Sequence, residues 1–553
     1  MPQYFPELKL EINGANASTE LMNDILQVSV EESLHLPSMF TIVLENSAFS
    51  GRSDETMWEH GNDFAMGTEI RIGFSNSTTQ AGKYQQEKTG WVISGEVTAI
   101  ETHFTDGSQA PIIIRGYDRS HRLHRGRYNR SFQNMTDTDL VRKIIGEIGI
   151  QAGTINDSGA PHDYVFQENQ TNMEFLRERA ARNGFELFVQ DGKLHFRAPK
   201  QDQSLTMTWL DDLSSFRVRV TSAEQVNNVE VRGWNYKQKQ AIVGTHSTNG
   251  VLTKTDHGEG QRTSSKFQPP APKLIVVDQL VDNINEAQKM AKALFNELCD
   301  EFVHADAQAP GDPDIRPGRV VTLSGAQMGK YAGKYYITET HHVFNARTYT
   351  TSFSVRGLRG GDLLSLLSPA TRLQPGQTLL IGKVTNNNDP DGLGRVRVKF
   401  PTLTEDHESQ WARVVAIGAG KNRGFDCLPE IDDEVLVGFE HGDIHRPFVI
   451  GGLWNGQDSP PESVSSSVMG SKVRLRTIKT RTGHQIQFVE EPNGGSQAGI
   501  TIKTVGGHLV QMNDTDRSIT LSSTGNLKIQ AGGNIDINAT GMITVQGAMI
   551  KLN

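Results

Sequence analysis

The residues of this chain that could bind a metal ion lie in a short acidic turn. Asn387, Asp389 and Asp391 alternate and Gly392 follows, which is how the calcium loop of an EF-hand begins. That loop needs a bidentate glutamate at its twelfth position, where this chain has Val398. The spacing therefore argues against calcium. It predicts a β-turn in which the Asp and Asn side chains accept hydrogen bonds from the backbone.

Two pairs of adjacent acids could form a catalytic carboxylate pair. They are Asp211-Asp212 and Asp432-Asp433. Hydrolysis of a sugar polymer needs two carboxyl groups that flank one bond, but neighbours on a strand point to opposite faces. Both pairs are therefore predicted to be turn residues. The sequence contains no nucleophile elbow, phosphate-binding loop or dinucleotide fingerprint.

Histidines and cysteines provide no recognisable ligand set either. The candidate histidines have no Cys, Asp or Glu at a known ligand spacing; they are His341 and His342 in a predicted strand, and His441 and His445 in a predicted loop. Cys299 and Cys427 are the only cysteines and lie far apart, which excludes a disulfide framework. We therefore expect a protein that is not an enzyme and that holds no metal and no cofactor.

Composition narrows the class of protein further. The 553 residues include 54 glycines and 36% hydrophobic residues, a balance typical of a β-rich chain with many turns. The formal net charge is −9 and no long basic run occurs, which argues against a nucleic-acid partner. The N-terminus lacks a secretory signal pattern, and no run of about 18 apolar residues could span a membrane. We expect the chain to be made in the cytoplasm.

The C-terminal residues repeat with a period of eight. From Ile519 onward, each repeat contains two apolar residues separated by one residue. Gly525, Gly533 and Gly541 recur at the same spacing of eight. Such a repeat leaves about five residues of strand, roughly 17 Å, which is too short for one chain to enclose its own core. We therefore predict an intertwined trimeric β-prism, also described as a β-helix. Its predicted core consists of Ile519, Leu521, Leu527, Ile529, Ile535, Ile537, Ile543 and Val545.

The residues before this tail form two further regions. Residues 1–370 alternate like half-buried strands, with three helical segments near residues 136–148, 171–184 and 283–298, which makes this part α+β. Intervals 46–90 and 245–272 lack periodicity and are predicted to be surface loops. Residues 377–457 contain five short strands, which predict a small closed barrel of the OB type. Its many acids argue against nucleic-acid binding.

Several stretches resemble a known family. Arg115–Ile150, Gln167–Phe196 and Ile315–Phe344 resemble the hub of VgrG proteins and of phage late-control D proteins. DPDGLGRVRVKFP, EIDDEVLVGFEHGD and RPFVIGGLWNG resemble the OB-fold base of phage baseplate spikes. The resemblance implies a hub of two barrel-like domains at 1–370, an OB-fold at 377–457, a linker at 458–471 and a prism at 472–553. The expected class is mainly β with an α+β hub.

The resemblance also implies a function. It predicts a structural homotrimer at the tip of a contractile injection system, which joins the inner tube to the tip and punctures the target envelope. Expected partners are the inner tube protein, baseplate subunits, effectors, a PAAR-type tip protein and, transiently, the target membrane. The tip protein is expected to bind Met549, Ile550, Leu552 and Asn553.

Alternatives to this reading stay open. One is a trimeric tailspike-type polysaccharide hydrolase or lyase, which would need carboxylates clustered on the repeats. Another is an adhesin fibre. Residues 456–470 are too few for the lysozyme that some phage spikes insert there, and nothing follows Asn553, so we expect neither a lysozyme nor an effector domain. Residue patterns do not distinguish a type VI, extracellular, cell-anchored or phage machine; the short length favours an extracellular system or a minimal VgrG.

Overall fold

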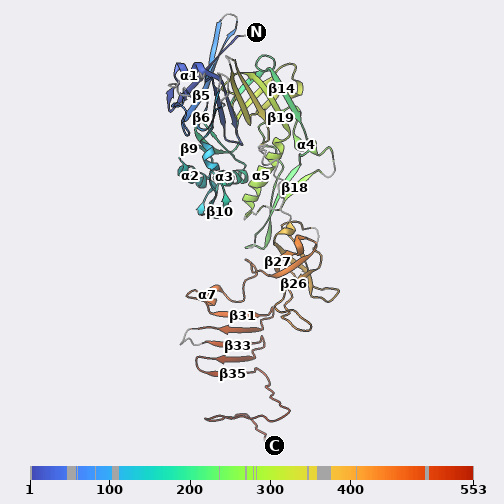
Figure 1. The fold of residues 1–553 in the computed structure, drawn as a ribbon. Coiled ribbons are helices and arrows are strands. Elements are labelled where there is room, and N and C mark those ends of the chain that lie inside the picture. Colours follow the sequence, from blue (N-terminus) through green and yellow to red (C-terminus); the bar gives the residue numbers. More distant parts are fainter. Residues whose placement is uncertain are drawn as a thin grey trace. The chain divides into compact units, whose positions relative to one another are not determined.

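The computed structural model describes residues 3–46, 58, 60–80, 83–102, 111–235, 237–267, 271–277, 279, 281, 283–345, 348–357, 375–405, 408–491 and 497–551. These residues form two compact units. The first contains residues 1–235 and 240–453, and the second contains residues 236–239 and 454–553 (Figure 1). In the described residues, no helix is long and apolar enough to cross a membrane.

An eleven-stranded sheet is the centre of the first unit, in the order β14-β19-β23-β22-β3-β4-β7-β6-β5-β1-β2. Strands β3 and β22 join its N-terminal and C-terminal halves, and one hydrophobic core packs against each half. The strands are β1 (Gln3–Ile12), β2 (Ala15–Asn16), β3 (Ile25–Ser33), β4 (Met39–Leu44), β5 (Glu69–Gln80), β6 (Lys83–Thr102), β7 (Ile112–Asp118), β14 (Ser215–Val220), β19 (Val303–Pro310), β22 (Glu339–Asn345) and β23 (Thr348–Val355); α1 (Thr19–Asp24) precedes β3.

A helical region follows β7 and has its own core. Both of its predicted helices are confirmed: α2 (Asp137–Ile148) and α3 (Asn172–Asn183) begin with capping boxes and end at glycines in the left-handed conformation, which only glycine adopts without strain. The other elements are η1 (Arg119–His124), β8 (Tyr128–Met135), β9 (Gln151–Ile155), β10 (His162–Gln170), β11 (Glu186–Gln190) and β12 (Lys193–Arg197).

The third predicted helix is α5 (Ile284–Asp300), capped by Asn283. It covers a three-stranded sheet, β16-β15-β18, and buries Met290 and Phe295, whereas Leu294 is only half-buried. The remaining elements of the hub region are β13 (Asp202–Thr208), β15 (Asn228–Asn235), β16 (Gln240–His246), β17 (Lys254–Thr255), α4 (Gly260–Ser264), β18 (Lys273–Val276), β20 (Arg319–Ser324), η2 (Gly329–Tyr331) and β21 (Gly333–Tyr336).

Two predicted surface loops are wrong in part. Much of interval 46–90 forms the hairpin of β5 and β6, because a ladder of partners on β1 and β6 supplies hydrogen bonds to polar residues that show no hydrophobic period. Phe64 is fully buried in the adjoining core. Interval 245–272 contains β17 and α4, where Ser264 is buried. Residues 47–57, 59, 81–82 and 268–270 of these intervals lie outside the described residues.

The predicted OB-type barrel is confirmed. Its five strands close in the order β24-β25-β26-β28-β27, and the alternating residues Val396, Val398 and Phe400 lie in its core. The elements are η3 (Pro375–Gln377), β24 (Leu380–Asn386), β25 (Arg395–Lys399), β26 (Ala412–Val414), β27 (Glu434–Phe439), η4 (Glu440–Gly442) and β28 (Pro447–Gly452).

The second unit is built on an antiparallel meander of five strands, β31 to β35, which we call the spike sheet (Figure 1). Its strands are β31 (Leu475–Lys479), β32 (Gln485–Val489), β33 (Gly499–Lys503), β34 (Leu509–Asn513) and β35 (Ser518–Ser522); α7 (Val464–Ser467), β29 (Val468–Met469) and β30 (Lys472–Val473) precede them. Residues 523–551 contain no strand. The strands predicted around Leu527, Ile535 and Ile543 therefore do not form in the single chain, which offers them no neighbouring strand to bond.

Candidate functional site

The acidic turn is a structural cap. The Asp389 carboxylate accepts hydrogen bonds from the backbone N–H groups of Asp391, Leu393 and Arg395, at 2.9 to 3.2 Å. The side-chain hydrogen bonds that Arg395 donates to Asp389 hold the pKa of that carboxyl far below its usual range. The β-turn prediction is confirmed, since the carboxylate is already saturated by donors of its own chain.

Three other candidate side chains are also held by hydrogen bonds within the chain. Asp212 accepts from the backbone N–H of Thr208 at 2.8 Å, and Asp433 accepts from that of Glu430 at 2.8 Å, so both acid pairs lie in turns as predicted. His342 is fully buried and its Nδ1 lies 2.8 Å from the Tyr349 hydroxyl; burial lowers its pKa to about 3. Among the described residues, no cluster of three His, Cys, Asp or Glu could hold a metal ion.

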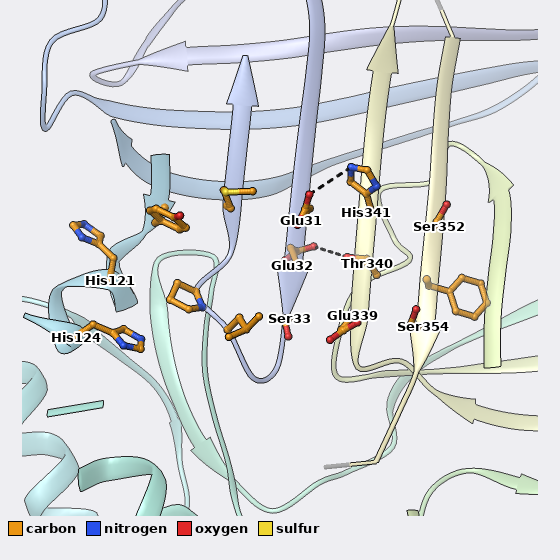
Figure 2. Close-up of a pocket in the computed structure, with 15 residues that line it drawn as sticks. Glu31, Glu32, Ser33, His121, His124, Glu339, Thr340, His341, Ser352 and Ser354 are labelled. Carbon is orange, nitrogen blue, oxygen red and sulfur yellow. Dashed lines mark hydrogen bonds and ion pairs between the residues drawn. The ribbon is translucent and has the colours of Figure 1, made fainter. Parts of the chain in front are cut away.

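A groove of about 830 Å³ lies on the eleven-stranded sheet and was not predicted (Figure 2). Glu31 and His341 come from neighbouring strands, with Oε1 and Nε2 3.9 Å apart, while His121 and His124 lie on the other side of the groove. Burial raises the pKa of Glu339 in its wall. The lining residues come from three distant parts of the sequence, so no local pattern could have revealed it. In its wall, the Ser354 hydroxyl donates a hydrogen bond to the Asp306 carboxylate at 2.9 Å.

The spike sheet presents a different kind of site, an apolar face without a cover. One row of apolar residues crosses all five strands and a second crosses β32 to β35, because each residue lies directly opposite the next one in the ladder; on β31 the second row ends at Arg476. One row is Ile478, Ile486, Ile502, Val510 and Leu521, and the other is Phe488, Ile500, Met512 and Ile519. Ile502 is 41% exposed and Ile519 is 75% exposed in the single chain.

The opposite face of the spike sheet is polar along its centre, with Leu475, Val489 and Leu509 in its outer rows. Its central row consists of Thr477, Gln487, Thr501, Gln511 and Thr520. Strands that alternate in this way bury one face and leave the other in water. A contiguous apolar face of this kind marks an interaction surface.

The predicted prism core continues this face. Ile519 and Leu521 lie at the ends of the two rows on β35. The other six, Leu527, Ile529, Ile535, Ile537, Ile543 and Val545, follow in the strandless segment and are 49% to 73% exposed. Of the predicted tip residues, Met549 and Ile550 are exposed, while Leu552 and Asn553 lie outside the described residues.

Comparison with known protein families gives two matches, one over the predicted hub region and one over the OB barrel. Residues 4–345 match the model of the Alg8 N-terminal domain. Residues 380–454 match the model of the type VI secretion system/phage-baseplate injector OB domain.

Two curated relatives cover most of this chain. The actin cross-linking toxin VgrG1 of Vibrio cholerae is 22% identical over 402 residues, which are 66% of this chain and 35% of that protein. The type VI secretion system spike protein VgrG5 of Pseudomonas aeruginosa is 21% identical over 406 residues, which are 66% of this chain and 50% of that protein. The chain thus spans between a third and a half of the length of these relatives.

Solved structures of tail proteins are similar at a lower level. The 43 kDa tail protein of prophage MuSo2 from Shewanella oneidensis has a TM-score of 0.47 and 16% identity, and covers 63% of this chain and 98% of that one. Because the TM-score is below 0.5, the family assignment rests on the sequence matches.

Proposed function

This chain belongs to the Alg8 N-terminal domain family and is a VgrG-like spike protein of contractile injection systems, and from that premise we propose that it is a structural homotrimer at the tip of such a machine. The observation that carries the proposal is the uncovered apolar face of the spike sheet. In this proposal residues 1–370 form the hub, 377–457 the OB domain, 458–471 a linker and 472–553 the prism. In the structure, the compact unit that contains the spike sheet begins earlier, at Trp454.

The size of the sheet supports three copies. A strand of five residues is about 17 Å long. Three such sheets closed into a triangular prism lie about 5 Å from the common axis, which is half of the roughly 10 Å that separates packed sheets. Four sheets would leave the axis about 8 Å away and the core unfilled. Three copies therefore fill the core with one layer of side chains from each sheet.

In the proposal, the eight-residue repeats that follow the spike sheet extend this prism. Its strands would pair with strands of the neighbouring copies, which supplies the hydrogen bonds that the single chain lacks. Closure also removes the exposed strand edges that would otherwise aggregate. The apolar tip around Met549 and Ile550 would then be covered by a PAAR-type partner.

The proposed mechanical role follows from this arrangement of hub and prism. The hub would join the inner tube and baseplate, and the stiff prism would transmit the thrust of contraction to the target envelope. In this role the protein is not an enzyme and acts as part of an injection particle that carries effectors. Among the described residues, Asp212, Asp389 and Asp433 are held in turns and His342 in the buried core, which supports a structural role over a polysaccharide hydrolase or lyase.

Deleting residues 475–553 tests the role. Particles from the cells that make this chain are expected to assemble with the truncated protein, because the hub and the OB barrel have cores of their own. They should fail to deliver cargo into target cells. Delivery at the wild-type level would contradict the puncturing role, and release of soluble sugars from peptidoglycan or polysaccharide by the full-length protein would favour the enzyme.

A further inference from the structure

The spike sheet contains a repeat that gives it two chemically different margins. Residues 479–490 read KTRTGHQIQFVE and residues 503–514 read KTVGGHLVQMND. Lys479 and Lys503 occupy the first position of each repeat, and Glu490 and Asp514 the last. Each repeat spans the end of one strand, a turn and the whole of the next strand.

The turns of the two repeats have the same construction. In each, the threonine hydroxyl accepts from the histidine N–H, at 3.0 Å for Thr480 and His484 and 3.2 Å for Thr504 and His508. The glycine before each histidine has a positive φ and donates its N–H to the threonine carbonyl. This fixes lysine and histidine at one side of the sheet.

The antiparallel strand that follows each turn leads the chain to the opposite side of the sheet, where the carboxylate that ends the repeat lies. We call residues 479–484 and 503–508 the histidine margin, and Glu490, Glu491 and residues 514–517 the carboxylate margin. The histidine margin holds Lys479, Arg481 and Lys503 and no acid. The carboxylate margin holds four carboxylates and Arg517, and two of these carboxylates, Glu490 and Glu491, pair with Arg476 and Arg474 of the same chain.

Several of these charges form no ion pair among the residues that the structure describes. Within the described residues, Lys479, Lys503 and Asp514 form no ion pair. Glu490 pairs with Arg476 at 2.6 Å. The matching position of the second repeat is Ile500, an apolar residue, so Asp514 lacks the equivalent arginine.

Rotational symmetry places these margins against each other. When sheets close around an axis with their apolar faces inward, one margin of each copy meets the other margin of the next copy, because the contact is head-to-tail. Lys503 is the last residue of β33, and Asp514 directly follows β34. When neighbouring copies sit at the same height, Lys503 of one copy and Asp514 of the next are offset along the axis by about one and a half strand spacings, roughly 7 Å. A lysine side chain spans that offset, and the same offset separates Lys479 from Glu490.

We propose that the partner of the histidine margin is the carboxylate margin of a second copy of this chain, with Lys503 bound to Asp514 of the next copy and Lys479 to its Glu490. This inference rests on the proposed trimer and deepens it. These pairs bring the cations of one margin to the carboxylates of the next copy's margin, which adds electrostatic attraction to the contact that the apolar face drives.

Charge exchange in the full-length protein tests the proposal. Lys503→Glu and Asp514→Lys are each expected to weaken the trimer about tenfold or more at low salt, because each places three repulsive pairs in it. The double variant Lys503→Glu/Asp514→Lys restores the attraction with reversed charges and should recover most of the loss. The readout is trimer dissociation under urea, followed by mass and by protease cleavage within residues 475–551.

A matched control keeps the result interpretable. Gln511→Lys adds a charge at the middle of the polar face, away from both margins, and should leave the trimer unchanged. The thermal unfolding of the hub checks that every variant folds. Single variants as stable as wild type, or a double variant no better than either single one, would overturn the proposal while leaving the trimer intact. A monomeric wild type would instead overturn the proposed function itself.

Discussion

Replacing Ile502 with aspartate is expected to prevent the spike from forming. Ile502 stands in the middle of the five-residue apolar row, between Ile486 and Val510. In the closed prism three carboxylates would enter one dry core, and each buried unpaired charge costs several kcal/mol. The spike segments should then stay open, and a protease should cleave within residues 475–551 at conditions where the wild type resists.

The neighbouring residue provides the control for this variant. Thr501 lies on the same strand but on the polar face, so Thr501→Asp adds the same charge outside the core. It should leave protease resistance and subunit mass as in the wild type. Equal behaviour of Ile502→Asp and Thr501→Asp would show that the apolar face is not buried between copies.

Replacing Arg316 with alanine is expected to destabilise the hub by about 3–5 kcal/mol, because it leaves a buried carboxylate uncompensated. The guanidinium is 4% exposed, as is the side chain of Glu32, with which it forms an ion pair at 2.6 Å. It also donates to the backbone carbonyls of Trp91 and Val92, at 3.2 and 2.6 Å, and to Asp191 at 2.7 Å. One side chain thus ties β3, β6 and the β11–β12 turn together. Urea unfolding of the hub measures the loss.

Two variants distinguish charge burial from a general effect of losing arginine. Arg319→Ala removes an arginine that pairs with the half-exposed Asp314 at 3.1 Å, and should cost less than about 1 kcal/mol. The double variant Glu32→Leu/Arg316→Met replaces both charges by apolar groups and should recover most of the stability. A loss for Arg316→Ala no larger than that for Arg319→Ala would contradict this account.

Local signals made much of the hub predictable. The capping pairs at Thr171 and Glu174, and the glycine after each of the first two helices, fixed helix ends within a few residues. The alternation of Val396 and Val398 likewise located a barrel strand. These features depend on residues close together in the sequence, so the amino-acid sequence alone is enough to reveal them.

Features that depend on distant partners escaped prediction. The β5–β6 hairpin carries polar residues whose strand character comes from the ladder with β1. The ion pair of Arg316 joins residues 284 positions apart, and the groove gathers three separate stretches. The strands predicted beyond Ser522 do not form in the single chain, and their pairing with partner chains stays a prediction. The repeated K-T-x-x-G-H was a readable signal, and comparing the two stretches at equal spacing would have found it.

The mass of the full-length protein in solution tests the central claim most directly. One chain has a mass of 61.0 kDa, and light scattering should give three times that value, persisting on dilution because the apolar faces are buried between copies. A single population at 61.0 kDa, with the protein folded, would contradict the trimer and with it the spike.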